Sequence, residues 1–342
     1  MHGDALLEEL HHGDTAAVAR AISLVENGRP GFERLLAGLH SRLGRARRIG
    51  ITGPPGAGKS TLTRQLVHHW RQQGRTVAVI AVDPTSPFTG GALLGDRIRM
   101  ESVALDRGVY IRSMATRGSL GGLATSTREV CDVLDGAGFE RILIETVGVG
   151  QSELAVTTMA DTTVLVLVPE SGDGIQALKS GVMEIADLFV VNKADRPGAG
   201  NLAREIESAI GIRKGRAYRG MRGHQLSGAR AAEGSGASPD EWLPPVLLAT
   251  ATSGTGIGEL VEALDRHQAW MESRGVLTQR RRARFAARTR EVVDRALRHQ
   301  VWNDTRAEAV LRERLDEVVS GRRSPYDVAE EILTGLRDGV KV

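Results

Sequence analysis

Short runs of β-branched residues alternate with helix-length segments along most of the chain. The runs lie at residues 49–52, 77–82, 109–113, 142–144, 163–168, 188–191 and 246–249. Most are continuously apolar rather than alternating, which is typical of strands that are buried on both faces. Strands that alternate with helices form a parallel sheet with helices on both sides. The sequence therefore predicts an α/β fold with a mostly parallel sheet flanked by helices.

Helical patterns lie on both sides of this region. Residues 5–43 carry apolar side chains at helical spacing, interrupted at 27–30, and helical patterns return at 278–302, 306–319 and 326–336. Residues 213–240 are rich in Gly, Arg, Ser and Ala without periodicity, which favours a mobile inserted loop. We expect an N-terminal helical region at 1–44, a central domain at 45–270 that contains this loop, and a C-terminal helical region at 271–342.

Composition excludes several classes of protein. The 342 residues include 45 Lys plus Arg against 42 Asp plus Glu, a net charge of +3 that is too even for a general nucleic-acid binder. A single cysteine, Cys131, allows no intrachain disulfide and fits a reducing compartment. No apolar run approaches the ~20 residues that span a bilayer, and the first residues lack a signal-peptide core. We expect a cytoplasmic protein that binds neither nucleic acid nor a membrane.

The small positive excess belongs to the C-terminal region. From Met271 onward there are 16 basic and 12 acidic residues, and seven arginines fall between Arg274 and Arg290 without an acidic residue among them. Such a run is typical of a solvated helix face, and contact with an acidic partner surface is the alternative.

A glycine-rich motif follows the first run and precedes a helical pattern at 59–73. Its sequence, Gly53-Pro-Pro-Gly-Ala-Gly58-Lys59-Ser60, matches GxxxxGK[ST]. In this pattern backbone N–H groups surround phosphate oxygens, the lysine reaches the outer phosphates and the hydroxyl binds Mg²⁺. We predict that a nucleotide's phosphates contact Gly56, Ala57, Gly58, Lys59, Ser60 and Thr61.

A second motif, Asn192-Lys193-Ala194-Asp195, follows the run at 188–191. The aspartate can accept from N1–H and the 2-amino group of guanine, whereas adenine lacks this donor pair, so the motif favours GTP over ATP. Two of the chain's five lysines lie in these two motifs. After the run at 246–249, a backbone N–H of Thr250, Ala251 or Thr252 can contact the guanine oxygen.

Carboxylates follow two of the predicted strands. Glu145 comes after the run at 142–144 and can serve the metal or its water, with the Gly148 N–H near the γ-phosphate. Asp83 and Asp96 are further candidate Mg²⁺ ligands beside Ser60 and Glu145. We assign catalytic roles to Lys59, Asp96 and Glu145.

The residue at the position that orients the attacking water in many small GTPases is different in this chain. Many small GTPases carry a glutamine directly after the glycine that corresponds to Gly148, but this chain has Val149 there and Gln151 two positions later. We therefore expect slow intrinsic hydrolysis, with a partner completing the site.

Taken in order, these motifs resemble the methylmalonyl-CoA mutase-associated GTPases of the MeaB/ArgK type. The similarity includes Asp83-Pro-Thr-Ser-Pro-Phe-Thr-Gly-Gly and Glu145-Thr-Val-Gly-Val-Gly-Gln-Ser-Glu153. The resemblance implies a homodimeric chaperone that uses GTP to gate adenosylcobalamin delivery to an acyl-CoA mutase and to protect that mutase. It also implies a Mg-GTP site lined by Lys59, Asp83, Asp96 and Glu145, a switch segment at 169–179, and dimer contacts through the C-terminal helices.

Three alternatives stay open at this point. One is an ATPase or kinase that phosphorylates a transport partner, which Asp195 argues against. Another is a nickel-site maturation GTPase, which normally carries His-rich or Cys-containing metal motifs that this sequence lacks. The third is an adaptor on the mutase that senses GTP without hydrolysing it.

Overall fold

The computed structural model describes most of the chain, and its residues form two compact units. The described residues are 2–11, 14–83, 103, 105–115, 120–146, 156–169, 182–213, 241–303 and 306–337. The first unit comprises Met1–Gln279 and the second Arg280–Val342. The predicted insertion lies outside the described residues except for residue 213, and so do residues 170–179 of the predicted switch segment.

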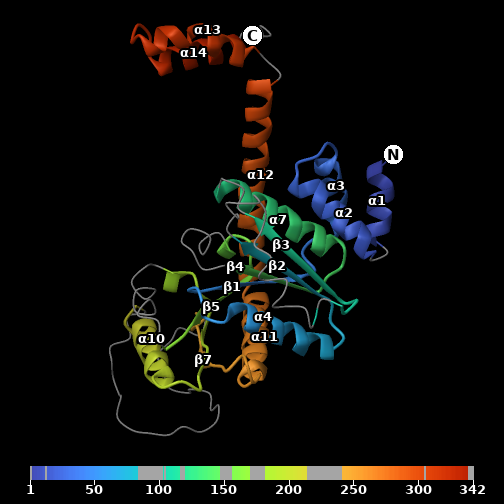
Figure 1. The fold of residues 1–342 in the computed structure, drawn as a ribbon, viewed down its shortest axis with the longest axis vertical. Coiled ribbons are helices and arrows are strands. Elements are labelled where there is room, and N and C mark those ends of the chain that lie inside the picture. The colour runs from blue at the N-terminus through green and yellow to red at the C-terminus, as the bar shows by residue number, and fades with distance from the viewer. Residues whose placement is uncertain are drawn as a thin grey trace. The chain divides into compact units, whose positions relative to one another are not determined.

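The first unit contains a seven-stranded sheet in which every strand pairing is parallel. The strand order is β3-β2-β4-β1-β5-β6-β7 (Figure 1). The strands are β1 (Arg47–Thr52), β2 (Val77–Asp83), β3 (Val109–Ala115), β4 (Arg141–Thr146), β5 (Thr162–Leu167), β6 (Leu188–Val191) and β7 (Val246–Leu248). The predicted α/β fold with a parallel sheet is confirmed.

Several strands extend beyond their apolar runs. β4 was expected at 142–144 but covers Arg141–Thr146, so Glu145 lies inside the strand rather than after it. Its backbone continues the ladder because residues 141–145 pair in register with residues 47–51 of β1. Hydrogen bonding between backbones does not depend on side-chain polarity, and the apolar pattern therefore underestimates strand length.

Helices α4 (Lys59–Gln72) and α11 (Ile257–Ser273) pack on one face of the sheet. Alternate strand residues point toward them, including Ile51 of β1, Val79 of β2 and Val166 of β5, and Trp70 of α4 is buried among them. Because successive side chains of a strand point to opposite faces, the neighbouring residues contribute to the other side of the sheet.

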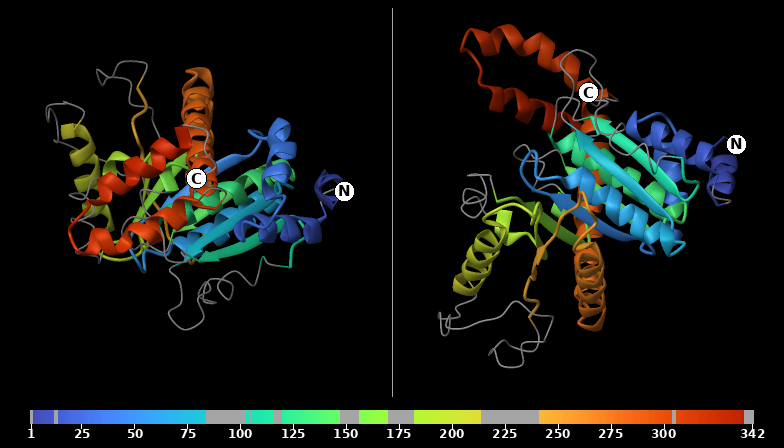
Figure 2. Two further views of the ribbon diagram at one scale, coloured as in Figure 1. Left: turned by 90° about the horizontal axis from the view of Figure 1, so that it is seen from above. Right: turned by 60° about the horizontal axis from the view of Figure 1, so that its bottom comes forward.

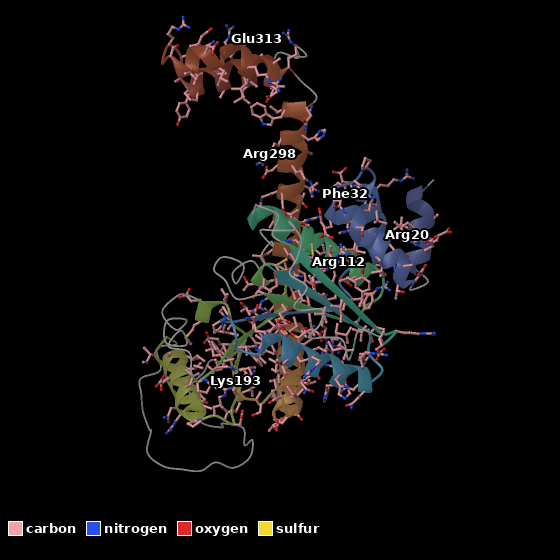
Figure 3. All side chains as sticks on the ribbon, in the orientation of Figure 1. Arg20, Phe32, Arg112, Lys193, Arg298 and Glu313 are labelled. Atoms are coloured by element: carbon pink, nitrogen blue, oxygen red, sulfur yellow. The ribbon has the colours of Figure 1, made fainter. Side chains whose placement is uncertain are left out.

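The opposite face is covered by α7 (Leu120–Gly136) together with the N-terminal helices α1 (His2–His11), α2 (Thr15–Glu26) and α3 (Phe32–Leu39). Figures 1 and 2 show these dark blue helices grouped beside α7. The 3-10 turn η1 (His40–Arg42) follows α3. An ion pair between Arg112 of β3 and Glu26 of α2 joins the sheet to this layer, and Arg112 lies beside these helices in Figure 3.

Near the β7 edge, helix α10 (Ala199–Arg213) covers β5 and β6 and packs its Ile206 against Phe189. The 3-10 turn η2 (Val182–Glu184) precedes β6.

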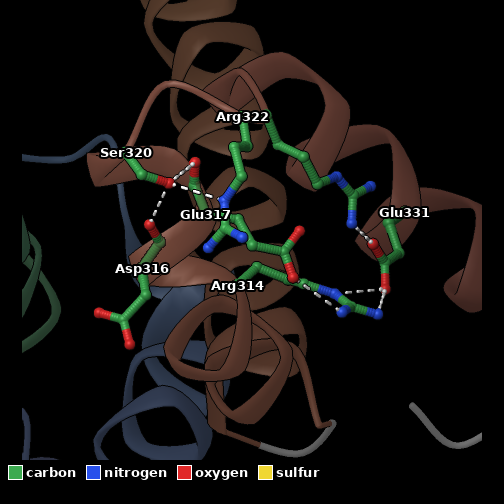
Figure 4. Close-up of polar contacts among 7 residues, drawn as sticks. Arg314, Asp316, Glu317, Ser320, Arg322 and Glu331 are labelled. Atoms are coloured by element: carbon green, nitrogen blue, oxygen red, sulfur yellow. Dashed lines mark hydrogen bonds and ion pairs between the residues drawn. The ribbon is translucent and has the colours of Figure 1, made fainter.

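The second unit is helical, as its sequence pattern predicts. The boundary between the units falls within α12 (Val276–Asn303), and α13 (Ala307–Val319) and α14 (Pro325–Arg337) follow. Ala307, Val328 and Ile332 form a small core of its own. Glu331 of α14 accepts from Arg314 of α13 at 3.2 Å, and Figure 4 shows these two residues facing each other. Glu331 also accepts from Arg323, which lies between the two helices, at 2.6 Å.

Candidate nucleotide-binding site

The glycine-rich motif forms the turn between β1 and α4, and two of its glycines are required by its geometry. Gly53 has φ 139° and Gly58 has φ 87°, in the region that L side chains rarely adopt. A Cβ on Gly53 would lie 2.1 Å from the Val166 carbonyl oxygen, and one on Gly58 would lie 2.3 Å from Nδ2 of Asn192. Residues 53–58 therefore hold a loop shape that no other residue types would allow at these two positions.

The Lys59 side chain forms hydrogen bonds with the backbone of this loop. Its Nζ donates to the carbonyl oxygens of Gly53 at 2.8 Å and Pro54 at 3.0 Å, and the residue is buried. Lys59 is also the first residue of α4, so its ammonium group and the positive end of the helix lie at the same place. This arrangement is suited to binding an anion such as a polyphosphate.

Ser60, Thr63 and Glu145 form a buried polar cluster beside the loop. Oγ of Ser60 donates to Oε1 of Glu145 at 2.5 Å, and Oγ1 of Thr63 donates to Oε2 of the same carboxylate at 3.0 Å. Glu145 is 4% exposed. The hydroxyl and carboxylate oxygens at this point are hard donors of the kind that Mg²⁺ prefers, and the chemistry of these residues fits a magnesium ion.

A second cluster joins the glycine-rich loop to the two segments predicted to bind the base. Nδ2 of Asn192 donates to the Ala57 carbonyl oxygen at 2.8 Å, and its Oδ1 accepts from the Ala251 N–H at 3.0 Å. Gln65 of α4 donates from Nε2 to the Ala251 carbonyl oxygen at 2.9 Å. The N–H group of Ala251 is therefore held by Asn192, which follows β6, and its carbonyl oxygen by Gln65 of α4.

The turn formed by Asn192-Lys193-Ala194-Asp195 leaves two of its side chains, those of Lys193 and Asp195, accessible to a ligand. Lys193, labelled in Figure 3, has φ 56°, the one positive φ of a non-glycine residue in the described part of the chain. The turn is fixed by a hydrogen bond from the Ala194 N–H to the Ala249 carbonyl oxygen at 3.0 Å. Asp195 is exposed and Lys193 half-buried.

The structure brings together several of the residues predicted from the sequence and leaves others outside its description. Lys59, Ser60 and Glu145 meet at the carboxyl end of β1 and β4, and Ala57, Asn192 and Ala251 meet at the base side. Asp83 ends β2 at the same edge of the sheet, which follows from the parallel strand directions. Its side chain, Asp96 and Gly148 lie outside the described residues.

Two residues of the site were not predicted: Thr63 and Gln65. Both lie on α4, and Thr63 follows Ser60 by three positions, which places the two hydroxyls on one face of the helix. The sequence signal for Thr63 is its place beside Leu62 and near Leu66, both fully buried, because a polar residue on the buried face of a helix needs a hydrogen-bond partner.

A parallel sheet with a glycine-rich loop between β1 and α4 defines a P-loop NTPase. The family model described as methylmalonyl-CoA mutase-associated GTPase MeaB matches residues 18–306, and the chain belongs to this family. A protein of Pyrococcus abyssi that is named as a GTPase is 42% identical over 336 residues, covering 98% of this chain and 97% of that protein. The GTPase ArgK of Escherichia coli is 33% identical over 338 residues, covering 97% and 93%.

A solved structure gives the same result at the level of the fold. The crystal structure of LAO/AO transport system kinase has a TM-score of 0.66 and 26% identity, and the match covers 98% of this chain and 97% of that one. Family membership and the names of the relatives confirm that the chain is a GTPase.

No group of three or more His, Cys, Asp or Glu side chains that could hold a metal ion occurs among the described residues. Of the helices built from these residues, none is both long and apolar enough to cross a bilayer.

Proposed function

We propose that this protein is a GTP-hydrolysing chaperone that gates adenosylcobalamin delivery to a cobalamin-dependent acyl-CoA mutase, such as methylmalonyl-CoA mutase, and protects it. The observation that carries this proposal is the family match over residues 18–306, because the family description names association with this mutase. We also propose that the protein acts in the cytoplasm, which is consistent with the presence of a single cysteine, Cys131, in the sequence.

Within this proposal, GTP binds along the carboxyl edge of the sheet. Its phosphates contact the backbone of residues 56–61 and Nζ of Lys59, and Asp195 accepts from guanine while the stem of Lys193 lies over the base. The Asn192 side chain supports this assignment because it ties the glycine-rich loop to the Ala251 backbone, so phosphate and base sites are mechanically linked. The remaining proposed contacts are Thr250, Ala251, Thr252 and Gly148.

Magnesium would be held at the same edge. We assign it to Ser60, Asp83, Asp96 and Glu145, and its chemistry is to neutralise charge on the β- and γ-phosphates. The buried contact between Ser60 and Glu145 supports this assignment, since it places two oxygen atoms of the kind that bind Mg²⁺, Oγ of Ser60 and Oε1 of Glu145, 2.5 Å apart. Lys59, Asp96 and Glu145 are the proposed catalytic residues.

Hydrolysis by the isolated protein is proposed to be slow. Val149 stands where many small GTPases have a water-orienting glutamine. In this scheme the mutase completes the arrangement around the attacking water, and hydrolysis is coupled to delivery of the cofactor.

The C-terminal unit is the proposed site of homodimerisation. Its helices expose large apolar side chains, including Val319 at 80% and Tyr326 at 85% exposure. Exposed apolar surface of this kind is typical of interaction sites. Sedimentation equilibrium would test this: Tyr326→Glu should shift a dimer toward monomer, whereas Arg312→Glu, a change at an exposed polar position of α13, should not.

The function is tested by two linked measurements. GTP hydrolysis should accelerate when an acyl-CoA mutase that co-purifies with the protein is added, and no acceleration by any such mutase would refute the chaperone role. In parallel, fluorescent GDP should bind far more tightly than ADP, and Asp195→Asn should reduce that preference. Equal binding of the two nucleotides would instead favour an ATPase or kinase.

A further inference from the structure

Glu145 occupies a position where its carboxylate must be held by hydrogen bonds. It lies in β4 between β1 and β2, in register with Ile51 and Ala81, and is 4% exposed. Burying a carboxylate is costly unless donors compensate for the lost water. The identity of those donors therefore decides how the carboxylate is oriented.

Each oxygen of this carboxylate has its own hydroxyl donor on α4. Ser60 donates to Oε1 at 2.5 Å and Thr63 to Oε2 at 3.0 Å. The terminal torsion of a glutamate is broad and roughly two-fold, so one anchored oxygen restrains it less than two. With both oxygens anchored, Oε1 is kept toward Ser60.

The two hydroxyls differ in their relation to the proposed cation. Ser60 belongs to the glycine-rich motif and is itself a proposed Mg²⁺ ligand. Thr63 lies one helical turn further on, fully buried, and has no proposed contact with nucleotide or metal. Its hydroxyl contacts the site through the hydrogen bond to Oε2 of Glu145.

We propose that Thr63 is a positioning residue for the magnesium site, since its hydroxyl holds Oε2 of Glu145 and thereby directs Oε1 toward Ser60. This inference rests on the proposed role of Ser60 and Glu145 in binding Mg²⁺. It assigns a function to a helix residue outside the GxxxxGK[ST] motif.

The test compares Mg²⁺-dependent and Mg²⁺-independent nucleotide affinity in the full chain. Binding of fluorescent GDP is measured with excess Mg²⁺ and with EDTA. Thr63→Val, which keeps the shape of the side chain and removes the hydroxyl, should leave the affinity in EDTA unchanged. The tightening by Mg²⁺ should fall by about tenfold, the lower end of what loss of a hydrogen bond to a charged group costs.

Two further variants make the result specific. Thr63→Ser restores a hydroxyl and should recover the Mg²⁺ effect. Thr127→Val removes another fully buried threonine hydroxyl, on α7, whose Oγ1 has no hydrogen-bond partner among the described residues, and should behave as wild type. Melting temperatures without nucleotide show whether each variant is folded.

Each outcome decides between explanations. An undiminished Mg²⁺ effect in Thr63→Val would overturn the inference, as would an equal loss of affinity in EDTA and in Mg²⁺, which indicates a structural role. If Mg²⁺ does not tighten GDP binding to the wild-type protein, the proposed metal site itself is wrong and the inference fails with it. If Mg²⁺ tightens GDP binding equally in the wild-type protein and in Thr63→Val, the proposed role of Thr63 is wrong and the proposed metal site is unaffected.

Discussion

Asp135, near the end of α7, holds together three parts of the first unit. Its carboxylate accepts from the backbone N–H groups of Gly44 at 2.8 Å and Ala46 at 2.9 Å, and from Nη2 of Arg48 at 3.0 Å. Burial alone would lower the pKa of the Arg48 guanidinium, but Asp132 and Asp135 raise it overall. The segment that leads from the N-terminal helices into β1 is thus fixed by charge-assisted hydrogen bonds.

Replacing Asp135 should therefore be strongly destabilising. Asp135→Ala leaves the buried Arg48 with less compensating charge and removes the carboxylate to which the Gly44 and Ala46 N–H groups donate, and should cost about 3–5 kcal/mol of unfolding free energy. Asp265→Ala, which removes an exposed partner of Arg47, should cost less than about 1 kcal/mol. Urea unfolding of both variants measures this difference, and similar losses would contradict it.

Gln65 is expected to control the base side of the nucleotide site. Gln65→Ala removes the donor to the Ala251 carbonyl oxygen and leaves the Ala251 backbone with its side-chain contact to Asn192. GDP affinity should fall by about fivefold, as expected for one neutral hydrogen bond of ~1 kcal/mol. Inorganic phosphate binding should not change, and a parallel loss of phosphate affinity would place the effect in the glycine-rich loop. Gln72→Ala, at an exposed position of the same helix, is the control.

At the scale of elements, strand and helix identity followed from residue pattern, whereas their ends did not. Continuous apolar runs predicted all seven strands because a strand of a covered parallel sheet must be apolar on both faces. Charged termini such as Arg47 and Arg141 pair through their backbones, which no side-chain pattern reveals. Glu145 was predicted as a site residue, but its donor Thr63 was not, because a polar residue on the apolar face of a helix does not show which residue 82 positions away it contacts.

The contact between α13 and α14 should weaken in acid. Hydrogen bonds from Arg323 and Arg314 lower the pKa of Glu331 below its ordinary value of 4.5, and those from the Ser324 N–H and hydroxyl lower the pKa of Asp327 below 3.8. A lowered pKa means that the stabilisation is complete above the unfolded value and is lost as the pH falls through the folded value.

This effect can be followed by hydrogen–deuterium exchange of residues 307–337, corrected for the intrinsic pH dependence of exchange. Protection should be constant above pH about 5 and fall below about 4. Glu331→Gln should show lower protection at neutral pH and a weaker dependence on acid. Protection that rises on acidification would contradict the assignment.

At the scale of the whole molecule, the two units have separate cores and separate proposed roles. The described residues that form the nucleotide site all belong to the first unit, whereas the exposed apolar side chains Val319 and Tyr326 belong to the second. The arginine run at 274–290 lies around the boundary, and contact with an acidic partner surface there stays a prediction.

A ligand that binds one folded unit stabilises that unit by mass action, so GDP should raise the melting temperature of the first unit selectively. At one hundred times the dissociation constant the stabilisation is about 2.7 kcal/mol. Trp302→Phe leaves Trp70, Trp242 and Trp270, all in the first unit, as the fluorescent reporters. In this variant the fluorescence transition should move upward with GDP, and in Asp195→Asn it should not.

The melting temperature of the second unit should depend on protein concentration rather than on GDP. If its exposed apolar surface pairs with a second copy, its transition in calorimetry should rise with protein concentration and be unaffected by GDP, because only association contributes to its stability. A single transition that rises with GDP and is independent of protein concentration would mean that the two units unfold together, without a dissociating dimer. The experiment thus separates nucleotide binding from self-association within one chain.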